Sequence, residues 1–120
     1  MVEPNFAVDD LDGGRVGTVH SLYIDADGGE PAWLVAKLGS GRRRTKLVAV
    51  PLRNCAVAAS RVWVAHEREA LLSAPLVDPT RPLLREHELA ICAHYGIGEG
   101  VGRAAEVTGR PEGAVTAQPA

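Results

Sequence analysis

The segments RVGTVHSLYI (residues 15–24), DADGGE (25–30) and PAWLVAKL (31–38) decide the fold of this chain. The first and third are rich in β-branched and apolar residues, which favour strands. The middle segment supplies the Asp and Gly residues that let a backbone reverse direction. This strand–turn–strand pattern predicts a β-hairpin. Gly17 interrupts the first strand, as expected at a bulge or at a sharp bend in a barrel.

Further strand patterns follow along the chain. TKLVAVPL (45–52) is almost entirely apolar, which predicts a strand buried on both faces. CAVA (55–58) and RVWVA (61–65) predict two short strands with a tight turn between them. Residues 6–65 are therefore expected to form a mainly β domain, a sandwich or small barrel, preceded by an extension at residues 1–5.

After residue 65 the pattern becomes helical. Two helical turns are predicted over residues 66–73, and residues 83–95 read as an amphipathic helix that ends at Gly96. Residues 66–95 thus form a helical appendage. Residues 96–120 hold mostly Gly, Ala, Pro and scattered charge, which cannot bury enough apolar surface to offset their ordering entropy, so we expect a disordered, flexible tail.

The predicted helix over residues 83–95 has an apolar and a polar face. Its apolar face is expected to contain Leu84, Ile91 and Tyr95, with Cys92 at the border. Its solvent-facing side is expected to contain Arg85, Glu86 and Glu88.

Composition limits the class of protein. The 120 residues are 46% apolar and 23% charged, with a formal net charge of -2, which fits one soluble globular domain. This charge does not favour a protein built mainly to hold nucleic acid or anionic lipid. Two cysteines are too few for a disulfide framework. The sequence shows no secretory signal and no apolar run of membrane-spanning length, so we expect no membrane span and a cytoplasmic location.

The order of these segments resembles the PRC-barrel family. The resemblance covers residues 6–95 and rests on VDD (8–10), GGRVGTV (13–19), LYID (22–25), PAWLV (31–35), VAVPL (48–52), VWV (62–64), SAP (73–75) and HYG (94–96). It implies a small antiparallel six-stranded barrel that serves as a docking surface, and no shared catalytic residues. Among the family's members, which include the barrels of the photosynthetic reaction-centre H subunit and of the ribosome maturation factor, the chain is most similar to stand-alone bacterial proteins.

No catalytic or metal-binding pattern stands out. His87 and His94 share a helical face but are seven residues apart, about 10 Å along the axis, too far for one zinc ion. The acidic turns near Asp10 and Asp25 lack the glutamate that ends a calcium loop and are better explained as hairpin turns. Cys55 has no activating base near it in sequence. We therefore expect no enzyme activity, no cofactor and no metal.

The candidate interaction residues form three groups. A basic hairpin tip would bind an acidic protein patch or RNA phosphates, or would remain a solvated loop. Trp33 and Trp63 are expected in the core by default, and one of them exposed beside the basic hairpin would be a binding hot spot. Ile91 and Tyr95 are candidates for self-association through the last helix. The basic residues are Arg42, Arg43, Arg44 and Lys46.

These patterns favour a non-catalytic protein-interaction module of unknown partner, with a homodimer as one option. The alternative is an RNA- or ribosome-proximal accessory factor that uses the basic hairpin. A third reading is a metal or small-molecule sensor.

Overall fold

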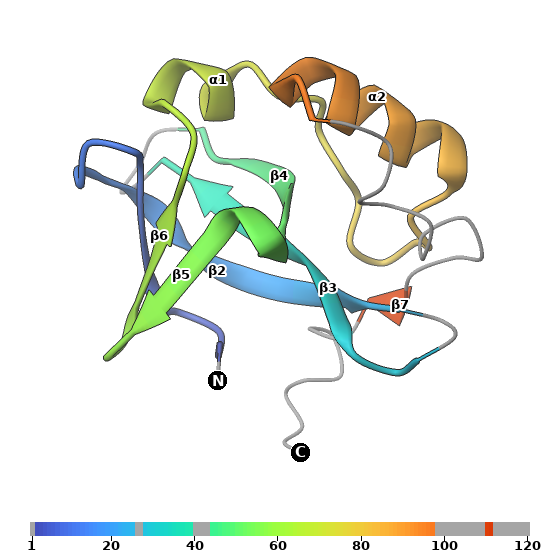
Figure 1. The fold of residues 1–120 in the computed structure, drawn as a ribbon, viewed down its shortest axis with the longest axis horizontal. Coiled ribbons are helices and arrows are strands. Elements are labelled where there is room, and N and C mark those ends of the chain that lie inside the picture. The colour runs from blue at the N-terminus through green and yellow to red at the C-terminus, as the bar shows by residue number, and fades with distance from the viewer. Residues whose placement is uncertain (1, 26–27, 40–43, 98–109, 112–120) are drawn as a thin grey trace.

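The computed structural model describes residues 2–25, 28–39, 44–97 and 110–111 (Figure 1). Its elements are β1 (Ala7–Asp9), β2 (Arg15–Ile24), β3 (Pro31–Leu38), β4 (Lys46–Pro51), the 3-10 helix η1 (Leu52–Asn54), β5 (Cys55–Ala58), β6 (Arg61–Val64), α1 (Arg68–Leu72), α2 (Arg85–Tyr95) and β7 (Arg110–Pro111). The predicted strands and both predicted helices are present.

Six strands form one curled sheet in the order β4-β3-β2-β1-β6-β5. The mainly β, six-stranded fold predicted from the sequence is confirmed, as a curled half-barrel and with one correction. Its pairing is not antiparallel throughout, because β1 pairs with β6 in parallel. The reason is that η1 takes the chain from β4 to the opposite edge of the sheet, where the second strand of the β5–β6 hairpin runs alongside β1 in the same direction. Figure 1 shows this hairpin on the left and α2 on the right.

Gly17 lets β2 and β3 approach closely. A Cβ atom at this position would lie 2.0 Å from the backbone oxygen of Lys37, so only glycine fits without moving the neighbouring strand. The register between β1 and β2 also shifts beside it, between Val8 and Asp9. The bulge predicted at Gly17 is confirmed.

Two hydrophobic clusters lie on opposite faces of the sheet. The inner cluster fills the half-barrel and includes Leu34 and Val48, and Leu71 of α1 joins it. The outer cluster covers the other face of β3 and β4, where Trp33 and Ala49 pack with residues of α2. Burial of β4 on both faces is therefore confirmed, because α2 supplies the second layer.

Helix α2 buries most of the face that the sequence predicted. It begins at Arg85, two residues later than expected, and Leu84 is its exposed N-cap residue. Glu88, which we expected at the surface, is 1% exposed, and its carboxylate lies 3.4 Å from the Arg85 guanidinium. Positions 88, 91 and 92 share one face by helical spacing, so the prediction is confirmed at Ile91 and Cys92 and wrong at Leu84 and Glu88. Gly96 ends the helix with a φ of 72°, as predicted.

The C-terminal residues are described only in part. Arg110–Pro111 form the short strand β7, which pairs antiparallel with Tyr23 and Ile24 of β2. The prediction of a flexible tail otherwise falls on residues 98–109 and 112–120, outside the described residues. Among the helices that the structure describes, none has the length and apolar character needed to cross a bilayer.

Candidate protein-interaction surface

The outer face of β6 presents an exposed tryptophan. Residues alternate along this strand, with Val62 and Val64 turned into the inner cluster and Arg61 and Trp63 turned outward. Trp63 is 40% exposed. Its cross-strand neighbour on β5 is Ala56, a small and exposed residue that leaves the indole uncovered on that side.

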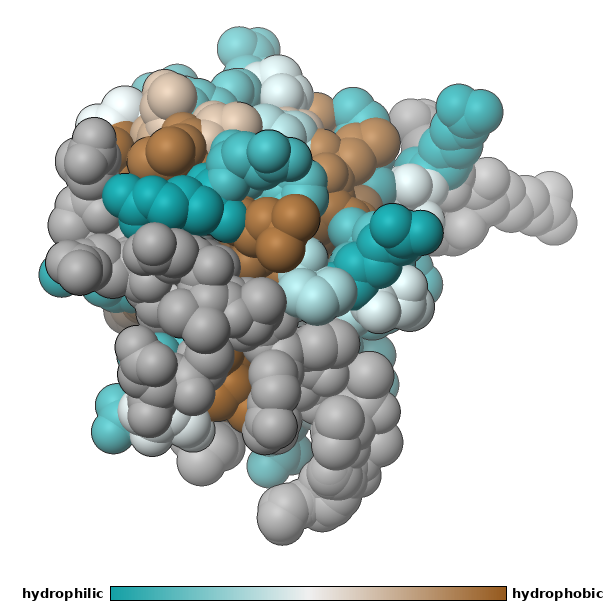
Figure 2. All heavy atoms as spheres, turned by 90° about the vertical axis from the view of Figure 1, so that its right-hand side faces the viewer, coloured by the Kyte–Doolittle hydropathy of each residue, from teal (hydrophilic) through white to brown (hydrophobic). Residues whose placement is uncertain are grey.

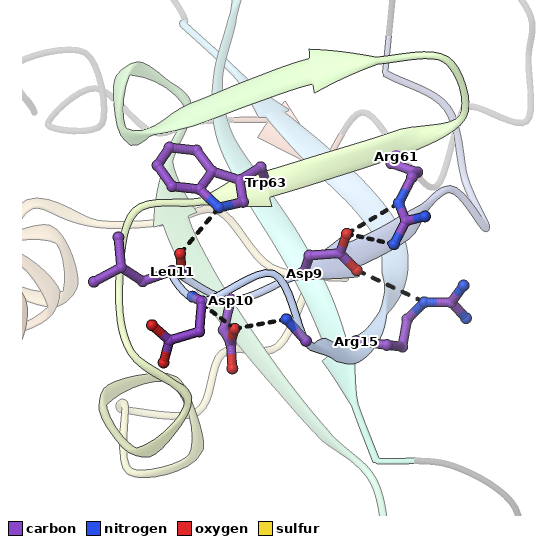
Figure 3. A network of polar contacts seen from close by, with 8 residues as sticks. Asp9, Asp10, Leu11, Arg15, Arg61 and Trp63 are labelled. Carbon is purple, nitrogen blue, oxygen red and sulfur yellow. Dashed lines mark hydrogen bonds and ion pairs between the residues drawn. The ribbon is translucent and has the colours of Figure 1, made fainter.

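A buried carboxylate beneath this surface holds two arginines. Asp9 lies beside Trp63 in the β1–β6 pairing, and its side chain is 8% exposed. Its Oδ2 accepts hydrogen bonds from Nε and Nη2 of Arg61, at 3.0 and 2.7 Å, and Arg15 Nε lies 3.8 Å from Oδ1 (Figure 3). The Arg15 and Arg61 side chains remain 60% and 56% exposed. Two guanidinium groups share one carboxylate, which holds both arginines at the surface.

The β1–β2 turn completes the surface. Asp10 Oδ1 accepts hydrogen bonds from the backbone N–H groups of Asp12 and Gly14, so the prediction that acidic residues stabilise this turn is confirmed. The turn presents Leu11, whose carbonyl oxygen accepts a hydrogen bond from Trp63 Nε1 at 3.2 Å. Leu11 is itself 40% exposed. We call Leu11, Arg15, Arg61 and Trp63 the Trp63 surface.

Three of the predicted interaction residues belong to the core instead. Trp33 and Ile91 are each 1% exposed, and Tyr95 is half-buried and packs against both clusters. Both tryptophans point outward from the half-barrel, but α2 covers only the one on β3. The default expectation of a core position is wrong for Trp63. Its place between the core residues Val62 and Val64 indicates that it points outward, but not whether a helix covers it.

The basic hairpin has a partly structural role. Lys46 Nζ donates a hydrogen bond to the carbonyl oxygen of Leu72 at 2.8 Å, which satisfies the last residue of α1. Arg44 is exposed, whereas Arg42 and Arg43 lie outside the described residues. The structure thus shows one exposed arginine and one helix-capping lysine from the predicted cluster.

Buried titratable groups behind β5 and β6 pack against one another. Burial raises the pKa of the Cys55 thiol to about 12, so it is protonated at neutral pH. The His66 ring stacks on Tyr95 with centroids 4.3 Å apart. Burial, and then the charge of His94, lower the pKa of His66, which favours its neutral form. No three His, Cys, Asp or Glu side chains in the described part of the chain are placed to share a metal ion.

An open hollow of about 410 Å³ lies between α2 and the segment before it. Tyr23 lines it and donates hydrogen bonds to the carbonyl oxygens of Asp78 and Arg81. Leu76, 67% exposed, stands at the same hollow. Figure 2 shows the side of the molecule where α2 and β7 lie, with hydrophobic residues interspersed among hydrophilic ones.

A comparison with models of known protein families identifies the family of this chain. A search of curated proteins gives no match to this chain. The model of the PRC-barrel domain matches residues 5–69, more than half of the chain. The matched residues span all six strands of the curled sheet, the β1–β2 turn and every residue of the Trp63 surface. This chain therefore belongs to the PRC-barrel domain family.

Proposed function

We propose that this protein is a non-catalytic protein-interaction module that binds its partner through the Trp63 surface. The observation that supports this most is an exposed indole on the same surface as two exposed arginines (Figure 3). Trp and Arg are the residues most enriched among binding hot spots, and Leu11 adds apolar area beside them.

The Trp63 surface is also held in place before any partner binds. The indole N–H of Trp63 is bonded to the turn, and Arg61 is tied to the buried Asp9 by two hydrogen bonds. Side chains that are already ordered lose less conformational entropy on binding, which favours affinity. Membership of the PRC-barrel family agrees with this role, because such barrels are small interaction modules.

A comparative affinity capture tests the proposal. Tagged wild-type protein, Trp63→Ser and Leu76→Ser are expressed in the source organism and their bound proteins quantified by mass spectrometry. Leu76 is the matched control, because it is an exposed apolar residue at the hollow beside α2. We expect a partner that wild type and Leu76→Ser retain and that Trp63→Ser loses by about tenfold or more. Equal recovery with Trp63→Ser would refute the assignment of this surface.

A further inference from the structure

The two edge strands of the curled sheet differ in how they are protected. At the β4 edge, Val77 N–H donates to the carbonyl oxygen of Leu47 at 3.0 Å, and Leu76 forms a bridge with Val48. The segment before α2 therefore covers that edge. At the other end, β5 pairs with β6 on one side, and no backbone partner lies along its outer side within residues 2–25, 28–39, 44–97 and 110–111. An open edge accepts an added strand.

The backbone groups available on β5 follow from its pairing with β6. Ala65 N–H donates to the carbonyl oxygen of Asn54 at 2.9 Å, so the residues just before β5 and just after β6 form a hydrogen-bonded pair. Because hydrogen-bonded and non-hydrogen-bonded pairs alternate, Ala56 bonds to β6, whereas the N–H and C=O of Val57 point away from it. Cys55 N–H bonds to the carbonyl oxygen of Leu52. Val57, 42% exposed, is thus the centre of the open edge.

Charge decides what this edge can accept. The four residues Cys55–Ala58 are uncharged, but an exposed Arg53 precedes them. The η1 end of the edge is therefore positive, whereas Arg61 lies on β6 and its guanidinium is bound to Asp9. A second copy of the chain, paired antiparallel about a twofold axis at Val57, would place Arg53 beside the Ala59–Ser60 turn of that copy, which carries no carboxylate. An incoming strand with a carboxylate at that end would pair with Arg53 and is favoured over the copy.

We propose that β5 binds an extended acidic segment of the partner protein as an added antiparallel strand. This inference rests on the proposed function and names the partner's chemistry. An apolar side chain of the added strand, placed opposite Val57, would cover the exposed Val57 side chain at the rim of the half-barrel. Opposite Ala56, a second apolar side chain would lie beside the Trp63 indole. A carboxylate at the end of the added strand nearest η1 would face Arg53.

A designed peptide tests this arrangement. The probe is a fluorescein-labelled Asp-Glu-Val-Leu-Thr-Asp-Asp, titrated with the full chain and followed by fluorescence anisotropy. Its controls are the same peptide with Lys at every acidic position, and the same peptide N-methylated at its valine, which lacks the N–H that would bond to Val57. We expect each control to bind about tenfold more weakly than the probe. Equal binding of probe and controls, or no binding of the probe below about 1 mM, would overturn the proposal.

Two protein variants complete the test. Val57→Pro removes the outward N–H without removing a bond to β6, and it should weaken probe binding about tenfold or more. Arg53→Glu should weaken it at least fivefold at low salt, with less effect at high salt. These results also separate the two proposals. Partner capture that is lost with Trp63→Ser but kept with Val57→Pro would leave the interaction surface standing and refute strand addition.

Discussion

Gly17→Ala tests the packing on which the half-barrel depends. The added Cβ would lie 2.0 Å from the Lys37 oxygen, 2.9 Å from the Lys37 carbonyl carbon and 3.0 Å from Leu38 Cα. All three atoms are backbone, so no side chain can rotate away. Strand β3 would have to move by roughly 1 Å or more to restore ordinary contact. Overpacking typically costs 1–3 kcal/mol, and we expect about 3 kcal/mol here, a roughly 150-fold change in the unfolding equilibrium.

Urea unfolding followed by tryptophan fluorescence measures this change, since Trp33 is buried and becomes exposed on unfolding. Gly14→Ala is the matched control, because its Cβ would meet only the Asp10 carboxylate at 3.7 Å. The control should remain within about 0.5 kcal/mol of wild type. If Gly17→Ala were equally stable, the close approach of β2 and β3 would not exist.

Three further changes have predictable effects on stability, each measured by urea unfolding. Ala59→Gly should raise the free energy of unfolding by about 0.5–1 kcal/mol, because Ala59 has a φ of 53° that glycine adopts without strain. Arg61→Ala should lower the free energy of unfolding by about 1–2 kcal/mol, because the buried Asp9 would keep only the 3.8 Å contact with Arg15. Arg15→Ala should lower it by less than about 0.5 kcal/mol. Equal effects of the two substitutions would contradict the geometry of the network. His66 has a pKa lowered from 6.5, so the unfolded chain binds more protons below that pH, and stability should fall as the pH drops from 7.5 to 5. His66→Gln should reduce this fall, and an unchanged pH dependence would exclude His66 as its source.

The hairpin of β2 and β3 could be predicted because its signals are local. β-Branched strands, an Asp- and Gly-rich turn and an interrupting Gly17 all lie within 24 consecutive positions, residues 15–38. The parallel pairing of β1 with β6 could not, because it joins Val8 to Val62 across most of the barrel. No local pattern determines which distant strand completes a sheet.

The exposure of the two tryptophans shows the same limit. Trp33 and Trp63 lie in strands and point outward from the half-barrel, so alternation treats them alike. Helix α2 covers the first and leaves the second exposed, and its position depends on tertiary packing. The buried Glu88 has a related origin. It shares a helical face with Ile91 and Cys92, but its charge predicted exposure, and only the packing of α2 against the sheet buries it.

Position-specific photo-crosslinking tests the interaction surface most directly. A photoreactive amino acid replaces Leu11, an exposed neighbour of Trp63, in one variant and Glu86, an exposed residue of α2, in another, and both are irradiated in cells of the source organism. We predict a discrete covalent adduct with one partner protein from position 11 and none with that protein from position 86. No adduct at position 11, or the same adduct from both positions, would contradict the proposed role of this surface.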